Sequence, residues 1–146
     1  MDPARLEGLP IFQDLTAEEL TLVAKAAFER SYREQATLFL ENMPGEVMYI
    51  IKSGSVDLSK RTPNAEDKVF VTLMPGEFFG EMSLLDENPR SASATVRDGG
   101  ELIVLSKKSL RELIAHHPAV AAKLLYNILR VVNTRLRRMT ELIKHV

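Results

Sequence analysis

The chain has 146 residues, of which 45% are hydrophobic, and this length and composition are typical of one globular domain. The lack of cysteine excludes disulfides, a thiolate nucleophile and cysteine-ligated zinc, and it favours a reducing, cytoplasmic location. The N-terminus lacks the apolar core of a secretory signal, and Lys123 and Arg130 interrupt the longest apolar stretch, so no membrane span is expected.

The net charge of −1 hides an uneven distribution of charge along the chain. Residues 118–146 hold six basic side chains and one acidic side chain, so this segment carries +5 and the remainder carries −6. A basic segment on an acidic body occurs in proteins that contact nucleic acids or membrane surfaces. A solvated helix face is the commoner origin of such charge, and we favour it here.

The first predicted element is a helix that begins after Thr16. The threonine side chain can cap the helix, and Glu19 occupies the position of its reciprocal partner in a capping box. Apolar residues then recur with helical spacing on one face, and these are Leu20, Val23, Ala24 and Ala27. We therefore predict a helical N-terminal segment over about residues 1–36.

Between residues 37 and 106 the apolar period changes to two. Val56 and Leu58 alternate with polar residues, and the run 69–73 alternates in a similar way. Such runs are typical of half-buried antiparallel strands. Many short strands at this spacing predict a mainly β fold, an antiparallel β-roll (double-stranded β-helix or jelly roll) with an N-terminal helix and a long C-terminal helix.

Turn signals separate the predicted strands. The tetrapeptide Met43-Pro44-Gly45-Glu46 recurs as Met74-Pro75-Gly76-Glu77, a combination that suits type II turns at two equivalent corners. The pairs Ser53-Gly54 and Asp98-Gly99 are further hairpin signals.

Two helices are predicted after residue 106. Ser106 is a suitable cap for the first, and Pro118 marks the start of the second, longer helix. The long helix carries an apolar heptad stripe, made of Ala122, Leu125, Leu129, Val132, Leu136, Met139, Ile143 and Val146. A second stripe beside it is made of Leu124, Ile128 and Val131. We expect one stripe to pack on the roll and the heptad stripe to form a homodimer, while burial of both stripes within one domain is the alternative.

Residues 78–92 contain the groups best suited to bind a ligand. Gly80 lets the backbone approach a ligand closely, and residues 81–85 have the composition of one short helical turn with free amides at its start. The forked guanidinium of Arg90 can contact two phosphate oxygens, and Ser91 adds a hydroxyl donor. These groups together indicate a site for one phosphate.

An acidic residue next to this site needs its own explanation, because Glu81 would repel a phosphate unless its carboxylate accepts a hydrogen bond from the ligand. A ribose 2′-hydroxyl is such a donor, as in dinucleotide sites. The sequence therefore predicts a nucleotide ligand, with the aliphatic residues Val71 and Leu73 facing the sugar and the base. Taken alone, Arg90 would be interpreted as a surface charge, and only its neighbours favour a binding role.

The pattern Phe-Gly-Glu-x-Ser-Leu-Leu followed by Pro-Arg-Ser-Ala resembles the phosphate-binding cassette of cyclic nucleotide-binding domains. This family includes bacterial catabolite activators, kinase regulatory subunits and cyclic-nucleotide-gated channels. The resemblance also covers residues 9–20, residues 51–56 and the two closing helices, which is nearly the whole chain. It predicts a single domain over residues 1–146, with a helical segment at 1–36, the roll at 37–106 and C-terminal helices at 107–146.

The resemblance also implies roles for particular residues. Glu81 would hold the ribose 2′-hydroxyl, Arg90 would pair with the cyclic phosphate, and Ser91 would supply a hydroxyl donor. In the family a residue of the C-terminal helix closes over the base, and Arg135 is the best-placed candidate here, although a merely solvated arginine is an equal alternative and Asn133 a weaker one. The complete predicted ligand-binding set is Gly80, Glu81, Met82, Ser83, Arg90, Ser91, Ala92, Val71, Leu73 and Arg135.

Enzymatic and metal-dependent functions find little support. A metal-binding cupin needs clustered histidine and carboxylate ligands, whereas His116, His117 and His145 all fall in predicted helices. Ser83 lacks an obvious base and more plausibly donates a hydrogen bond near the phosphate. We therefore expect no catalysis, no metal and no cofactor.

The expected function is a sensor module that binds a cyclic nucleotide and moves its C-terminal helix. Serine at position 91 is compatible with cAMP and with cGMP, and we expect cAMP because bacterial relatives with serine there mostly use it. No recognition helix follows the long helix, so direct DNA binding is not expected from this chain. Two alternatives stay open, namely a ligand-independent dimeric adaptor and the sensor half of a longer transcription regulator.

Overall fold

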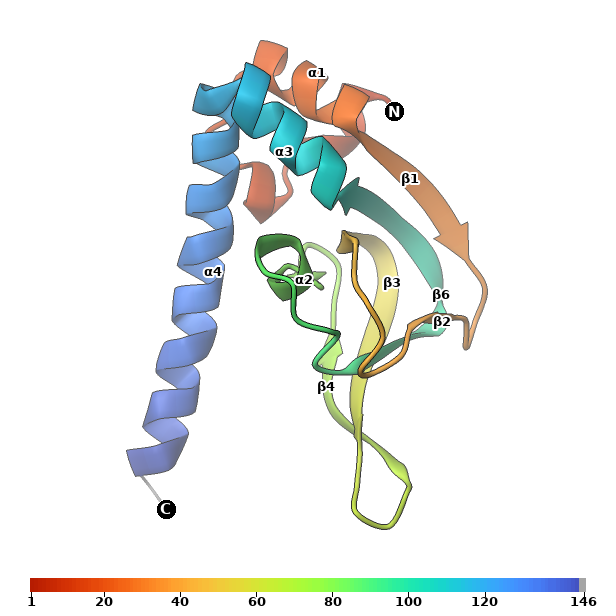
Figure 1. Ribbon diagram of the computed structural model, residues 1–146. Helices are drawn as coiled ribbons and strands as arrows, with labels where there is room; N and C mark the ends of the chain where they lie inside the picture. The colour runs from red at the N-terminus through yellow and green to blue at the C-terminus, as the bar shows by residue number, and fades with distance from the viewer. Residues whose placement is uncertain (145–146) are drawn as a thin grey trace.

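The computed structural model describes residues 1–144 and shows an antiparallel β-roll with helices packed at one end and along one side (Figure 1). His145 and Val146, the last position of the predicted heptad stripe, lie outside the described residues. The helices are the 3-10 helices η1 (Pro3–Leu6) and η2 (Pro10–Phe12), followed by α1 (Ala17–Ala26), α2 (Met82–Leu85), α3 (Lys107–His116) and α4 (Pro118–Lys144). The strands are β1 (Ala27–Tyr32), β2 (Thr37–Phe39), β3 (Val47–Arg61), β4 (Asp67–Leu73), β5 (Phe78–Phe79) and β6 (Ser93–Ser106).

All strand pairs are antiparallel, and this confirms the predicted β-roll with flanking helices. The strands follow the order β1-β6-β3-β4, with β2 paired to β6 and β5 paired to β3. The helical assignment over residues 1–36 was wrong for its last part, because Ala27 pairs with Leu105 and begins a strand. Long-range pairing with β6 overrides the local helical spacing that placed Ala27 on the apolar face of α1.

The two predicted hairpins at Ser53-Gly54 and Asp98-Gly99 are absent, because β3 and β6 run continuously through them. The two strands pair along their length, and Gly54 faces Gly100 where the register shifts. A Cβ atom at Gly54, whose φ is +83°, would lie 2.0 Å from the Gly99 carbonyl oxygen. These glycines therefore allow two long strands to bend and approach closely, and they do not reverse the chain.

The two Met-Pro-Gly-Glu segments differ in structure. At residues 74–77 the chain turns as predicted, since Gly76 has a φ of +91° and the Glu77 N–H donates to the Met74 carbonyl at 3.1 Å. Gly45 does not adopt a positive φ, so the predicted type II turn does not form there. Its small size serves packing, because a Cβ atom at Gly45 would lie 2.5 Å from Arg90 Nε.

Two hydrophobic clusters share the central strands. Along β3, Met48 and Ile50 pack with the helices, whereas Tyr49 and Ile51 point into the roll. The alternation of side chains along a strand therefore buries both faces of this segment. The predicted helix caps are present, because Thr16 and Glu19 form a complete capping box and Ser106 accepts from the Ser109 N–H.

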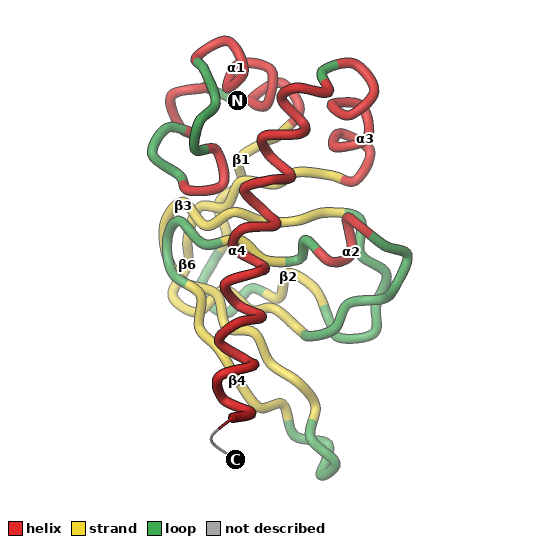
Figure 2. The backbone as a smooth tube through the Cα atoms, turned by 90° about the vertical axis from the view of Figure 1, so that its left-hand side faces the viewer, coloured by secondary structure: helices red, strands yellow, loops and turns green. Residues whose placement is uncertain are grey.

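Helix α4 starts at Pro118, as predicted, and runs beside the strands past α2 (Figure 2). Its first half is anchored by the buried residues Leu124 and Ile128 and by Asn127, whose side-chain amide donates to the Ile11 and Gln13 carbonyls at 2.9 and 2.8 Å. Among the helices of residues 1–144, none combines the length and the apolar composition that a membrane span requires.

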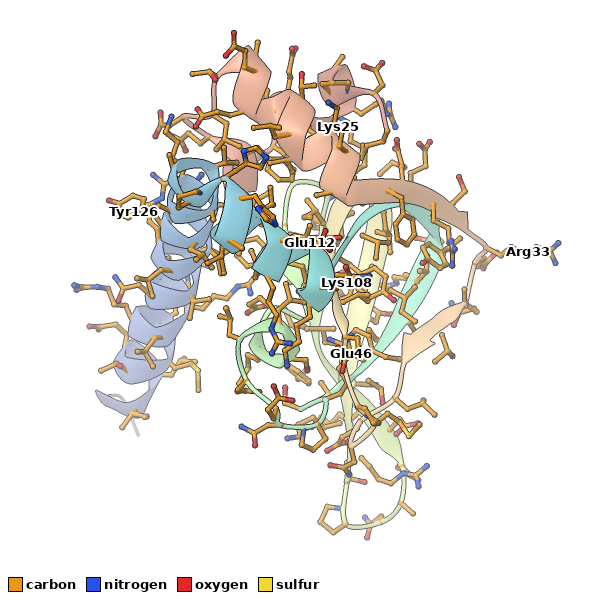
Figure 3. The ribbon with its side chains drawn as sticks, turned by 45° about the horizontal axis from the view of Figure 1, so that its top comes forward. Lys25, Arg33, Glu46, Lys108, Glu112 and Tyr126 are labelled. Carbon is orange, nitrogen blue, oxygen red and sulfur yellow. The ribbon has the colours of Figure 1, made fainter. Side chains whose placement is uncertain are left out.

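The heptad stripe of α4 divides into a covered and an uncovered part. Leu125 and Val132 are partly buried and pack against the hydrophobic cluster that joins the helices to Met48 and Ile50. Other positions of the stripe are exposed by 60 to 72%, namely Leu129, Leu136, Met139 and Ile143. Tyr126 also lies on the side of α4 that faces away from the strands (Figure 3).

Candidate ligand-binding site

A pocket of about 370 Å³ lies where the cassette, the β3–β4 hairpin and α4 meet. This volume falls within the range of small-molecule sites, roughly 300–1,000 Å³. Its polar lining comes from the cassette and α4, and much of its remaining wall is apolar. The lining residues are Phe39, Leu58, Phe70, Phe79, Gly80, Glu81, Met82, Ser83, Arg90, Ser91, Ala92, Arg135 and Met139.

Strand β5 fixes the start of the cassette. Phe78 and Phe79 pair with β3 and are buried in the two different hydrophobic clusters, so this short strand is held from both sides. Gly80 follows with a φ of +82°, and a Cβ atom there would lie 2.8 Å from Arg90 Nη1. Glycine at this position therefore provides both the left-handed backbone and the room for the arginine.

Arg90 is 4% exposed, and backbone oxygens hold its guanidinium. Nη1 donates to the Gly80 carbonyl at 3.2 Å, Nη2 donates to the Val47 carbonyl at 2.7 Å, and the guanidinium carbon lies 4.0 Å from the centre of the Phe39 ring. Within residues 1–144, no carboxylate forms an ion pair with Arg90, and its Nε is buried without a hydrogen-bond partner.

The environment of Arg90 has an electrostatic consequence. Burial lowers the pKa of the Arg90 guanidinium, although the side chain stays charged. A buried cation without an anionic partner is costly, and an anion at the mouth of this pocket would relieve that cost. The free Nε and the forked geometry suit the oxygens of a phosphate.

Glu81 stands at the N-cap of α2 and is 8% exposed. Its carboxylate accepts a hydrogen bond from Arg135 Nη1 at 3.3 Å, and Arg135 Nη2 donates to the Phe78 carbonyl at 2.7 Å. These two contacts join α4 to the cassette through Arg135. They differ from the alternative interpretation, in which Arg135 is only a solvated arginine on the helix surface. Glu81 also lines the pocket, so its carboxylate is a hydrogen-bond acceptor for a ligand hydroxyl there.

The structure brings eight of the ten predicted residues to the pocket. Ser83 and Ala92 line it from buried positions, while Met82 and Ser91 line it from exposed ones. Val71 and Leu73 do not line it, although they belong to the roll cluster as inward-facing residues.

Several lining residues were missed by the sequence analysis. Leu58 and Phe70 form the hairpin wall that was assigned to Val71 and Leu73. Met139 follows Arg135 by four residues, so helical spacing could have placed it on the same face, but it was assigned to the heptad stripe alone. The role of Phe39 beneath Arg90 had no local signal, because β2 is only three residues long.

No three His, Asp or Glu side chains in the described part of the chain gather so that they could hold a metal ion. The polar side chains of the pocket are instead hydrogen-bond donors and one carboxylate. The donors suit an anionic group of a ligand, and the carboxylate suits a ligand hydroxyl.

Comparison with known proteins identifies the family. The profile of the cyclic nucleotide-binding domain matches residues 29–117. The "Cyclic AMP receptor protein" of Thermus thermophilus is 35% identical over 132 residues, which cover 90% of this chain and 59% of that protein. The "CRP-like cAMP-activated global transcriptional regulator" of Mycobacterium tuberculosis is 32% identical over 128 residues, covering 88% of this chain and 55% of that protein.

A solved structure supports the same assignment. The cyclic nucleotide-binding domain from Methylobacillus flagellatus superposes with a TM-score of 0.86 at 28% identity, covering 96% of this chain and 82% of that one. The chain spans less than two thirds of the length of the two curated relatives. The profile match and the shared fold together show that this chain belongs to the cyclic nucleotide-binding domain family, whose members are regulatory binding domains and not enzymes.

Proposed function

We propose that this chain is a sensor domain that binds cAMP in preference to cGMP in the pocket beside α4. The observation that carries the proposal is the buried Arg90 guanidinium, which has backbone acceptors but no carboxylate partner within residues 1–144. The cyclic phosphate would supply the missing anion, and Glu81 would accept from the ribose 2′-hydroxyl. The names of the Thermus and Mycobacterium relatives, which refer to cAMP, support the choice of base.

The base would lie between the hairpin wall and α4. Phe70 and Leu58 provide one apolar side, and Met139 provides part of the other. An aromatic side chain next to a purine favours stacking. Arg135 lies at the same end of the pocket and is the group on α4 able to respond to the ligand, because the carboxylate that it contacts is the proposed ribose acceptor.

Calorimetric titration with cAMP, cGMP and cyclic di-GMP tests this proposal, with R90A as the variant. We expect cAMP to bind most tightly, and R90A to lose about 2–5 kcal/mol of binding free energy, or roughly 30-fold to several thousand-fold in Kd. R33A is the matched control, because it removes the same charge from a side chain that points into solvent (Figure 3). If the folded wild type binds no cyclic nucleotide at micromolar concentration, the ligand-independent adaptor is the better description.

Two further parts of the proposal concern output. We propose that ligand binding shifts α4 through Arg135, since differential contacts in two helix positions are what a signal requires. We also propose that the exposed part of the heptad stripe forms a homodimer. Because the chain covers 59% and 55% of the two curated relatives, a DNA-binding region in a longer protein is the alternative setting for this sensor. The cytoplasmic location and the absence of direct DNA contact by this chain stay predictions.

A further inference from the structure

The loop of residues 86–89 determines where Arg90 stands, because it connects α2 to that arginine. Backbone hydrogen bonds hold its two ends. The Asp86 N–H donates to the Met82 carbonyl at 3.1 Å, and the Arg90 N–H donates to the Met43 carbonyl at 2.8 Å. Between these bonds the Asn88 N–H donates to Asp86 Oδ1 at 2.9 Å, and residues 87–89 are exposed to solvent.

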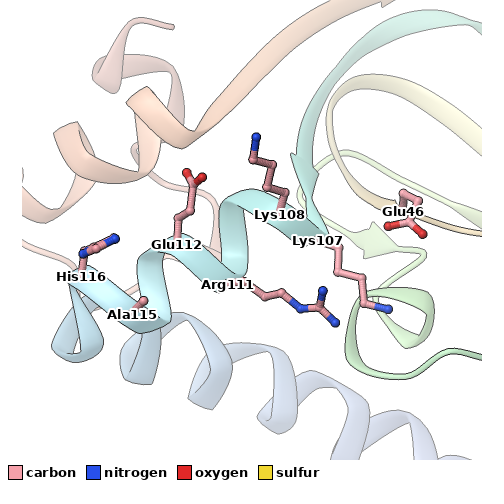
Figure 4. A pocket seen from close by; sticks show the side chains of 7 residues that line it. All are labelled: Glu46, Lys107, Lys108, Arg111, Glu112, Ala115 and His116. Carbon is pink, nitrogen blue, oxygen red and sulfur yellow. The ribbon is translucent and has the colours of Figure 1, made fainter.

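Lys107 of α3 supplies a contact to this loop. Although it is a lysine, it is only 4% exposed, and its Nζ donates to the Asp86 carbonyl and to the Glu87 carboxylate, each at 2.9 Å. Figure 4 shows its side chain pointing from the start of α3 toward the α2 segment, whereas Lys108 points to the opposite side. The ammonium group also lowers the pKa of the Glu87 carboxyl.

The backbone of Lys107 contacts the other side of the cassette. Its N–H donates to the Glu46 carbonyl at 2.8 Å, and the next residue, Val47, provides the carbonyl that accepts from Arg90 Nη2. One residue of α3 therefore fixes both the loop that precedes Arg90 and the strand end that receives its guanidinium. A buried ammonium is costly unless it is paired, so the packing of α3 alone does not account for lysine at this position.

We infer that Lys107 is a positioning residue of the ligand site, which acts through the 86–89 loop and not by touching the ligand. This inference rests on the proposed binding of a cyclic nucleotide at Arg90. With the tether, the loop is ordered before the ligand arrives, so less conformational entropy is lost on binding. Without it, the site stays folded but Arg90 samples more positions.

The variant K107M tests this role, and K108M is its matched control. Methionine fills a similar space without charge, and because the Glu87 side chain is exposed, water can solvate its carboxylate once the ammonium is gone. Lys108 is the adjacent residue with an exposed side chain, so K108M removes the same charge without touching the loop. We expect K107M to unfold in urea like the wild type and to bind cAMP about tenfold more weakly, while K108M keeps the wild-type affinity.

Hydrogen exchange of the ligand-free protein gives a second measurement that does not depend on binding. The Asp86 and Arg90 amides should exchange about tenfold faster in K107M than in K108M, with no change in α1. Equal affinity and equal exchange in K107M and K108M would overturn the inference. If wild-type protein binds no cyclic nucleotide, the proposed function fails, and the exchange measurement alone still decides whether Lys107 orders the loop.

A second variant covers the case in which K107M does not fold. Glu87 is exposed on the surface, with 83% of its side chain accessible, so E87Q leaves the packing of α3 unchanged. It removes the ion pair to Lys107 and also the longer one to Arg111, at 3.5 Å. We expect faster exchange of the Arg90 amide in E87Q, by a smaller factor than in K107M because the Asp86 carbonyl remains as an acceptor. Wild-type exchange in E87Q, together with an unfolded K107M, would assign Lys107 to fold stability alone.

Discussion

Replacement of Leu136 by lysine is a direct test of the proposed homodimer. Leu136 is 60% exposed in the isolated chain, and its heptad neighbours Leu129 and Ile143 are exposed by 65 and 72%. Burial of a whole leucine side chain contributes about 1.5–3 kcal/mol, so burial of the exposed part contributes about 1–2 kcal/mol for each protomer. A two-fold interface loses this contribution twice, and it also gains a pair of like charges.

We therefore expect L136K to weaken the dimer by about 3–5 kcal/mol, or roughly 150-fold to several thousand-fold in Kd. The fold itself should be unaffected, because Leu136 does not belong to either hydrophobic cluster. Sedimentation equilibrium over a range of concentrations measures this change. I114K is the control, since Ile114 is an exposed apolar residue, accessible by 46%, on α3 instead of α4.

Two results would refute the reasoning. The first is a wild-type chain that stays monomeric at every concentration tested, which would mean that exposure of the stripe does not drive association. The second is an unchanged sedimentation mass for L136K, which would place any interface elsewhere on the surface. A loss of mass in both L136K and I114K would indicate a general effect of added charge.

Three further changes test the fold and the site. G80A should lower the free energy of unfolding by about 1–2 kcal/mol and also weaken cAMP binding, because Gly80 has a φ of +82° and lies against Arg90. Urea unfolding measures the first effect and calorimetry the second, and unchanged values of both would contradict the packing described. N127A should cost about 1–3 kcal/mol in urea unfolding, since it leaves the buried Ile11 carbonyl and the part-buried Gln13 carbonyl without their amide donor. A cost below about 0.5 kcal/mol would contradict this. The hydrogen bonds from Lys123 and from the backbone N–H of the N-cap lower the pKa of Glu19, so the free energy of unfolding should fall as the pH drops below 4.5. E19Q should reduce the slope of unfolding free energy against pH in this range, and an equal slope in E19Q would assign the pH dependence to other carboxylates.

Local chemistry made much of the fold predictable. The caps at Thr16 and Ser106 and the proline at residue 118 are signals that act within a few residues, and the helices begin where they predict. The cassette was also recognisable, because its glycine, carboxylate and arginine lie close together in sequence.

Features that depend on long-range pairing were not predictable from local signals. Gly54 and Gly99 carry the composition of hairpin turns, but the backbone approach that requires them involves strands more than forty positions apart. The pocket wall shows the same limit. The period of two separates Phe70 from Val71 and Leu73, yet it cannot say which face lines the pocket.

The position of Arg90 connects the stability of the fold with its function. The two hydrophobic clusters hold β5 and β3 in place. The Val47 carbonyl at the start of β3 and the Gly80 carbonyl directly after β5 accept from the guanidinium. Neutral acceptors satisfy its hydrogen bonds in part but do not cancel its charge. In the proposed function, binding of the cyclic phosphate relieves the remaining electrostatic cost of burying this cation, and that relief contributes to the affinity for the ligand.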